Sequence, residues 1–348
     1  MPRMMDRGRT PTHLSPEMSS HLAKVGHNHS IPAKCIRIAL INNMPDAALE
    51  DTEAQFFDLL DAAAGDIPVH IKLFSLPEIP RDELGKQHLN ESYSGIEDLW
   101  NSEFDATIIT GTEPRQPDLR AEPYWHTLSS IIDWAAENTV STVLSCLAAH
   151  AGVLYSDGIE RRSLAQKQFG VFNYKKANEN PLTRGTAEQI QIPHSRWNEV
   201  REHALVSCGY TVLTKSAEAG ADLFVKKNKR SLFVHFQGHP EYGARTLLKE
   251  YRRDIKRFIR GERKAYPTMP HGYFDVVSTE LLNDFQEKAL SNPREMVLRE
   301  FPEAAIAATL QNTWRPAASC IYRNWLHYVA ATKADVSPRA ALTPVGHG

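Results

Sequence analysis

Cys146 is the residue that the sequence best places to act as a nucleophile. It follows the apolar run Thr142-Val-Leu-Ser, which predicts a buried strand, and precedes Leu147-Ala-Ala-His-Ala-Gly-Val-Leu, which predicts a helix. Strand, sharp turn and helix form a nucleophile elbow, in which the helix N-terminus favours a thiolate and the Leu147 N–H is available to an oxyanion. The alternative is a structural cysteine, because free cysteine is among the most buried residue types.

A general base is predicted at Gly238-His239-Pro240-Glu241-Tyr242, at the end of a later strand. Proline biases His239 toward an extended backbone, on which side chains two residues apart project the same way. Glu241 would then accept a hydrogen bond from one ring nitrogen of His239 and leave the other nitrogen for the thiol. That arrangement of nucleophile, base and orienting carboxylate is a catalytic triad.

Alternating strands and helices predict an α/β fold, with a doubly wound, mostly parallel sheet flanked by helices and a small helical C-terminal portion. A loop is predicted at Pro193-His-Ser-Arg and a longer one over 261–275. The pattern predicts strands over 35–42, 69–74, 105–111, 141–145, 169–172, 223–226 and 231–237, and helices over 50–64, 125–138 and 244–259.

Residues 1–33 lack periodicity and predict a flexible extension; residues 34–332 form the folded domain, and residues 333–348 a flexible tail. A net charge of −2 and a pI near 6.7 indicate no basic surface that would bind nucleic acid or an anionic membrane. The four cysteines have no C-x-x-C spacing, so we expect neither a zinc site nor a redox pair. Reduced thiols and the lack of a signal-like apolar segment indicate a cytoplasmic protein. We expect no metal site, reading the His27 and His29 pair as part of a solvated tail.

The order of nucleophile and base resembles the class I glutamine amidotransferase fold, and the surrounding motifs resemble the homoserine O-succinyltransferase and O-acetyltransferase family. The motifs, which span roughly residues 35–330, are Asn43-Met-Pro, Thr52-Glu-Ala-Gln-Phe, Ile109-Thr-Gly, Tyr124-Trp, Cys146, Lys167 with Phe169-Gly-Val, Pro193-His-Ser-Arg, Gly238-His-Pro-Glu-Tyr, Arg253-Asp and Asn324-Trp-Leu.

The resemblance implies a ping-pong acyl transfer from succinyl-CoA to L-homoserine, the first committed step of methionine biosynthesis. It implies Cys146 as nucleophile, His239 as base and then acid, and Glu241 as orienting residue. Gly111 and Leu147 would form the oxyanion hole. Lys167, Ser195, Arg196, Tyr242 and Arg253 would line the site or hold the acceptor, although an ion pair, a solvated lysine or a loop cap would explain several of them equally well. It also implies a homodimer and no bound cofactor, with acyl-CoA as co-substrate.

Three departures from the family pattern affect the acyl pocket. Asp46-Ala-Ala-Leu-Glu-Asp stands where the family carries a lysine-containing stretch, Thr112-Glu113 replaces Ala-Pro, and Leu147 replaces tryptophan. Arg115 is nearest to a family position that separates acetyl from succinyl donors, and its guanidinium would pair with a succinyl carboxylate. Acetyl-CoA as donor and L-serine as acceptor stay open, as do two other classes: a glutamine amidohydrolase and a non-catalytic binding module.

Overall fold

The computed structural model describes residues 35–336. The predicted extension, residues 1–33, and residues 337–348 of the predicted tail lie outside this range. The strands are β1 (Ile36–Ile41), β2 (Val69–Phe74), β3 (Ala106–Ile109), β4 (Ser141–Ser145), β5 (Arg162–Lys176), β6 (Gln189–Glu199), β7 (Thr211–Val212), β8 (Thr214–Ser216), β9 (Gly220–Ala221), β10 (Leu223–Asn228) and β11 (Ser231–Phe236).

The α-helices are α1 (Asp46–Ala64), α2 (Glu83–Ser92), α3 (Glu97–Trp100), α4 (Trp125–Asn138), α5 (Leu147–Asp157), α6 (Glu202–Ser207), α7 (Thr246–Ile259), α8 (Val276–Ser291), α9 (Glu303–Ala307) and α10 (Arg315–Val336). Short 3-10 turns occur at η2 (Leu119–Ala121), η3 (Pro181–Thr183) and η4 (Glu295–Glu300). Among residues 35–336, no helix combines the length and apolarity that a membrane span requires.

The main sheet confirms the predicted α/β class. Its seven strands run in the order β2-β1-β3-β4-β11-β10-β7. The five from β2 to β11 pair in parallel, whereas β10 and β7 pair antiparallel at one edge. In this order β4 lies between β3 and β11, so the chain segments that follow these three strands emerge side by side at one edge of the sheet.

Alternation along the strands gives the sheet two apolar faces. In β1, Ile36, Ile38 and Leu40 belong to the cluster that contains α1 and α10, while Ala39 and Ile41 belong to the cluster that contains α4 and α5. This is the period-two pattern of a strand that is buried on both sides. Helices therefore cover both faces, as the predicted doubly wound sheet requires.

A second, antiparallel sheet in the order β6-β5-β8-β9 was not predicted. The loop prediction at Pro193-His-Ser-Arg is wrong, because these residues lie within β6, where Val171 of β5 is the partner of Pro193. Proline is tolerated there because β6 is an edge strand, so its missing N–H breaks no ladder bond. The Pro193 carbonyl accepts a hydrogen bond from the N–H of His239, 2.9 Å away, which links this sheet to the predicted base.

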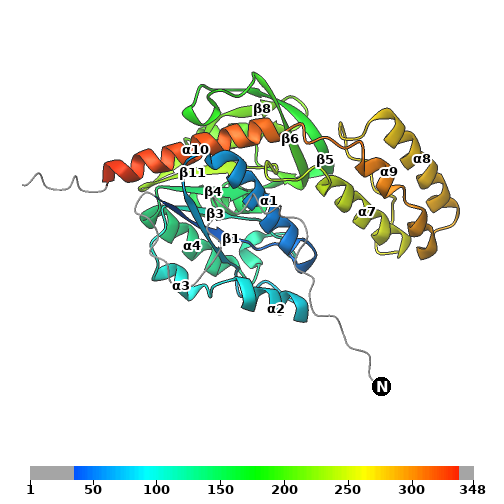
Figure 1. Ribbon diagram of the computed structural model, residues 1–348, viewed down its shortest axis with the longest axis horizontal. Coiled ribbons are helices and arrows are strands. Elements are labelled where there is room, and N and C mark those ends of the chain that lie inside the picture. The colour runs from blue at the N-terminus through cyan, green and yellow to red at the C-terminus, as the bar shows by residue number, and fades with distance from the viewer. Residues whose placement is uncertain (1–34, 337–348) are drawn as a thin grey trace, which may run out of the picture.

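The helical C-terminal portion divides into two parts (Figure 1). Helices α7, α8 and α9 gather at one end of the molecule, where they share an apolar cluster with Phe169 and Val171 of β5. Helix α10 instead returns across the main sheet and lies beside α1. It continues to Val336, so the predicted tail begins inside the helix; Lys333 bonds the Cys35 carbonyl and the Asp105 carboxylate, each 2.8 Å away.

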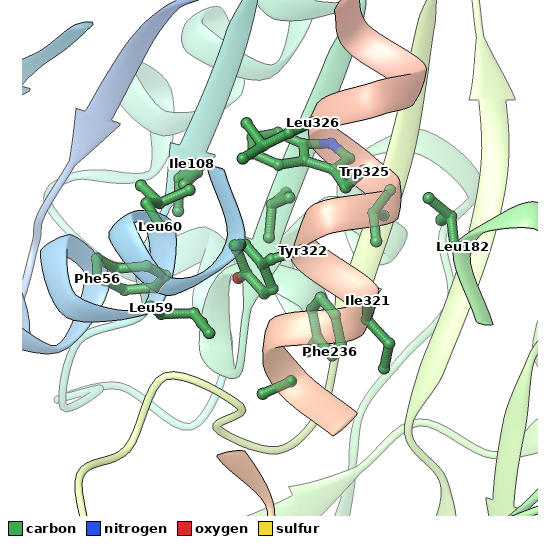
Figure 2. Close-up of a cluster of buried hydrophobic side chains, with 14 of the residues drawn as sticks. Phe56, Leu59, Leu60, Ile108, Leu182, Phe236, Ile321, Tyr322, Trp325 and Leu326 are labelled. Carbon is green, nitrogen blue, oxygen red and sulfur yellow. The ribbon is translucent and has the colours of Figure 1, made fainter. Parts of the chain in front are cut away.

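Figure 2 shows the cluster that α10 completes, with Tyr322, Trp325 and Leu326 directed at α1 and the sheet. The Trp325 indole is 1% exposed and its Nε1–H donates to Ser141 Oγ at 2.9 Å, at the start of β4. The C-terminal helix is therefore part of the core that supports the Cys146 strand.

We predict that Trp325→Ala lowers the free energy of unfolding by about 3–5 kcal/mol, because it removes a fully buried aromatic side chain and leaves a cavity. Urea unfolding followed by circular dichroism measures this. Trp197→Ala is the matched control, since Trp197 is 51% exposed and should cost about 1 kcal/mol or less. Equal losses in the two variants would contradict the packing role of α10.

Candidate active site

The turn between β4 and α5 confirms the predicted elbow geometry. Cys146 is the N-cap of α5 and has φ 52° and ψ −111°; Lys229 is the only other non-glycine residue with positive φ among residues 35–336. A side-chain-bearing residue in this region costs of order 1–3 kcal/mol, which packing must offset. The Cys146 N–H donates to the Phe236 carbonyl of β11 at 2.8 Å, and this bond fixes the turn to the neighbouring strand.

Gly111 lies directly against the first residue of α5. A Cβ atom at position 111 would come within 2.9 Å of the Leu147 nitrogen and 2.8 Å of the Leu147 Cβ, so glycine is required by the close approach. Within residues 35–336, the N–H groups of Gly111 and Leu147 have no hydrogen-bond acceptor. Two free donors beside a sulfur atom are what an oxyanion needs.

Asn43 holds the segment that carries Gly111 through both its backbone and its side chain. Its backbone N–H donates to Thr110 Oγ1 at 2.8 Å and its Nδ2 donates to the Thr110 carbonyl at 3.2 Å. The Asn43-Met-Pro motif therefore has a structural task, which is to tie the end of β1 to the end of β3.

His239 and Glu241 form the predicted pair, with Nδ1 of the ring 2.8 Å from Oε1 of the carboxylate. The backbone is a turn closed by the Tyr242 N–H and the His239 carbonyl at 3.1 Å, rather than the extended segment that the sequence predicted. The ring of Tyr242 stacks on His239 at 4.2 Å, and the Trp314 indole N–H donates to the Tyr242 carbonyl at 2.8 Å. Stacking on Tyr242 and the bond to Glu241 thus fix the orientation of the imidazole.

The electrostatics of His239 favour a protonated ring. Burial acts to lower its pKa, but the charges of Cys146 and Glu241 and hydrogen bonds to both side chains outweigh burial, so the pKa of His239 is raised well above its usual value. Such coupling requires the sulfur and the imidazole to be neighbours. The imidazole is therefore placed to exchange a proton with the thiol.

A buried polar network lies beneath this turn. Asp222 Oδ1 accepts the Gly238 N–H at 2.6 Å and lies 3.6 Å from His194 Nε2, which bonds the Tyr174 hydroxyl at 2.8 Å. Burial raises the pKa of Asp222 to about 7 and lowers that of His194 well below its usual value, with the Arg196 charge adding to the second shift. His194 therefore supports the site as a neutral residue.

A cavity of ≈ 820 Å³ opens over Cys146 and His239. In the lining of the same cavity, Lys167 Nζ lies 3.2 Å from Asp254 and 3.6 Å from Glu250, and Arg253 contacts the same two carboxylates at 3.3 and 3.8 Å. The Tyr242 hydroxyl donates to Glu250 at 2.6 Å, and so does the Ser195 hydroxyl at short range. This cluster presents both charge signs, which suits a zwitterionic amino acid.

Two predicted residues are placed differently from this group. Arg196 lines the cavity, but its guanidinium is 3% exposed and donates to His194 Nδ1 and to the carbonyls of Asn198 and Ala219. Arg115 is exposed and lines an adjoining cavity of ≈ 240 Å³ that Cys146 does not reach.

The cavity-lining residues that sequence reasoning missed include Glu250, Asp254, His150 and Arg161. Glu250 and Asp254 lie on α7, where charged residues are expected on the exposed face of an amphipathic helix. Only their contacts with Lys167 show that they belong to the site. Burial lowers the pKa of His150 to about 3, assisted by the Arg196 and Arg161 charges, so this ring is neutral. Residues 35–336 contain no cluster of three or more His, Cys, Asp or Glu side chains arranged to bind a metal.

Comparison with known proteins identifies the family. A family model described as homoserine O-succinyltransferase matches residues 18–336, most of the chain. This chain belongs to the homoserine O-succinyltransferase family. The match confirms the resemblance inferred from the motifs.

Named members of the family are similar over nearly their whole length. The homoserine O-succinyltransferase of Rhodopseudomonas palustris is 42% identical over 87% of this chain and 91% of its own length, and that of Bradyrhizobium japonicum is 43% identical over 85% and 90%. A glutamine amidotransferase of known structure from Thermotoga maritima aligns over 85% of this chain and 98% of its own, with 13% identity and a TM-score of 0.44, a similarity too low to bear on activity.

We predict that Cys146 reacts with iodoacetamide at pH 7 about tenfold faster than in a His239→Asn variant, because a neighbouring imidazolium favours negative charge on the sulfur. Since the pKa of His239 is raised, its positive charge persists through neutral pH and disappears as the pH rises past that value. The difference between the two proteins should therefore shrink in alkaline solution.

Peptide mass spectrometry of alkylated protein measures the rates. Cys208 and Cys320, which are also partly exposed, serve as internal controls whose rates should not differ between the two proteins. Identical pH–rate profiles for Cys146 in the wild type and the variant would contradict the pairing with His239.

Proposed function

We propose that this chain transfers a succinyl group from succinyl-CoA to the hydroxyl of L-homoserine through an acyl-Cys146 intermediate, as the first committed step of methionine biosynthesis. The observation that carries the proposal is the position of Cys146 at the N-terminus of α5, coupled to His239 and open to a cavity lined by Lys167, Glu250 and Arg253. Family membership supports the substrate pair.

In the first half-reaction, the Cys146 sulfur attacks the thioester carbonyl carbon. The resulting oxyanion accepts hydrogen bonds from the N–H groups of Gly111 and Leu147, each such donor being typically worth about 3 kcal/mol in the transition state. The tetrahedral intermediate collapses with cleavage of the bond to the coenzyme sulfur. The imidazolium of His239 supplies the proton to the leaving thiolate, and Glu241 keeps the ring oriented.

In the second half-reaction, neutral His239 takes the proton of the acceptor hydroxyl while its oxygen attacks the acyl-cysteine. A second tetrahedral oxyanion occupies the same two donors and collapses to release the ester and the Cys146 thiolate. His239 ends protonated, as it began. One set of residues thus serves both transfers, which is the physical basis of a ping-pong sequence.

The acceptor amino acid fits the charged cluster of Lys167, Glu250 and Arg253 in the cavity lining. The Arg253 guanidinium, 44% exposed in its side chain, can bind the carboxylate, while Glu250 can accept from the ammonium group. Ser195, Tyr242 and Lys167 hold Glu250 in place, and Arg196 supports the β6 backbone. Serine is one methylene shorter than homoserine, a difference worth only about 1–3 kcal/mol, so it is the competitor to compare.

The proposed setting is the cytoplasm, where four free cysteines stay reduced, and the proposed assembly is a homodimer, as the family resemblance implies.

We predict that succinyl-CoA, in the absence of acceptor, adds one succinyl mass to the wild type and none to Cys146→Ala. Intact-mass spectrometry after rapid acid quench measures the label, and Cys208→Ala is the matched control that should label normally. Added homoserine should then remove the label faster than serine does.

Absence of a label with both succinyl-CoA and acetyl-CoA, together with no CoA release when homoserine is added, would contradict the acyltransferase proposal. Ammonia release from glutamine would instead indicate an amidohydrolase. If neither reaction occurs, the binding-module alternative is favoured.

A further inference from the structure

Arg161 lies between the Cys146 cavity and the segment that follows Gly111. It is half-buried and lines the same cavity as Cys146 and Leu147. Its Nη2 donates to the carbonyls of Gln116 and Pro117 at 3.3 and 3.0 Å. Two carbonyl acceptors on Nη2 fix the plane of the guanidinium and, among the residues described, leave its other two nitrogens without an acceptor.

The two nitrogens without an acceptor distinguish Arg161 from the other cations of the cavity. Within residues 35–336, Nε and Nη1 of Arg161 form no hydrogen bond, and the guanidinium forms no ion pair. By contrast, Lys167, Lys249, Arg253, Arg257 and Arg263 each contact a carboxylate, the nitrogens of Arg196 are occupied, and Lys264 is exposed. Nε–H and Nη1–H point to different sides of the guanidinium, so either can donate one charge-assisted hydrogen bond to a carboxylate in the cavity.

The surroundings keep this group charged and close to the reacting sulfur. Burial lowers the pKa of Arg161, and the charges of Tyr124, Glu122, Asp118 and Cys146 oppose that shift. Glu122, the nearest carboxylate in this set, is beyond ion-pair distance and has one oxygen occupied by the N–H groups of Arg115 and Gln116 at 2.5 and 2.6 Å. The neutral His150 adds no competing cation on this side of the cavity.

We propose that Arg161 binds the free carboxylate of the succinyl group and thereby selects a dicarboxylic acyl donor over acetyl-CoA. The inference rests on the proposed function and specifies its acyl pocket. A succinyl thioester on Cys146 carries its carboxylate a few bonds from the sulfur, and acetyl has no charge there. A half-buried guanidinium facing an acetyl group would lack an anionic partner, which disfavours acetyl as donor.

This assignment differs from the prediction that Arg115 is the succinyl-binding residue. Arg115 is separated from the Cys146 cavity and is exposed, so a carboxylate bound there would compete with water and salt. Its role stays a prediction, and the two arginines can be compared directly.

The test is the donor preference of Arg161→Gln. With succinyl-CoA, kcat/KM and the rate of Cys146 labelling should both fall about 10- to 100-fold, because a charge-assisted hydrogen bond and the attraction of a half-buried cation are lost. With acetyl-CoA, kcat/KM should be unchanged or higher, and kcat/KM for homoserine, which reports only the second half-reaction of a ping-pong sequence, should not change. Arg161→Lys, which keeps the charge but not the planar guanidinium, should fall between the two. Arg162→Gln changes an exposed arginine that does not line the cavity and is the matched control expected to behave as the wild type, while Arg115→Gln tests the rival assignment.

Four outcomes would overturn the inference: an unchanged donor preference in Arg161→Gln, an equal loss with both donors, a fall in kcat/KM for homoserine, or a larger loss of succinyl preference in Arg115→Gln. A wild type that prefers acetyl-CoA would overturn it while leaving acyl transfer intact. A wild type that neither donor labels would instead refute the proposed function itself. Thermal midpoints measured on all variants separate loss of folding from loss of recognition.

Discussion

The positive-φ turn at Cys146 is the constraint on which the rest of the site depends. Because β4 lies between β3 and β11 with all three strands parallel, the turn has Gly111 on one side and the His239 turn on the other. A nucleophile, two free N–H donors and a base therefore meet at three adjacent strand ends. The geometry also explains why position 111 tolerates no side chain, since a Cβ there would collide with Leu147.

Holding this turn requires support from distant parts of the chain. Helix α10 packs the far face of the sheet and bonds the start of β4 through Trp325, while Trp314 holds the Tyr242 carbonyl of the base turn. The second sheet contributes from below, where the Pro193 carbonyl accepts the His239 N–H and His194 packs beside Gly238. A strained turn and a buried ion pair are thus stabilised mainly by elements that carry no reacting group.

Much of this arrangement could be predicted from sequence, because the signals for the elbow and for the His239–Glu241 pair are local. The strand and helix around Cys146 follow from apolar runs of the right length, and the buried strands of the main sheet from their β-branched residues. The second sheet could not be found in this way, since Pro193 reads as a loop signal and only its non-local pairing with β5 makes it a strand. Arg161 was missed because its neighbours in the sequence are charged, which is typical of an exposed segment. Its place in the cavity depends on non-local hydrogen bonds to the carbonyls of residues 116 and 117.

The central claim is that the acyl group leaves the coenzyme for Cys146 before the acceptor takes part. Exchange of isotopically labelled CoA into succinyl-CoA, measured without homoserine, tests this claim most directly, because exchange requires a reversible acyl-enzyme. The account predicts exchange in the wild type and none in Cys146→Ala. Exchange that occurs only when homoserine is present would contradict it and would indicate direct transfer in a ternary complex.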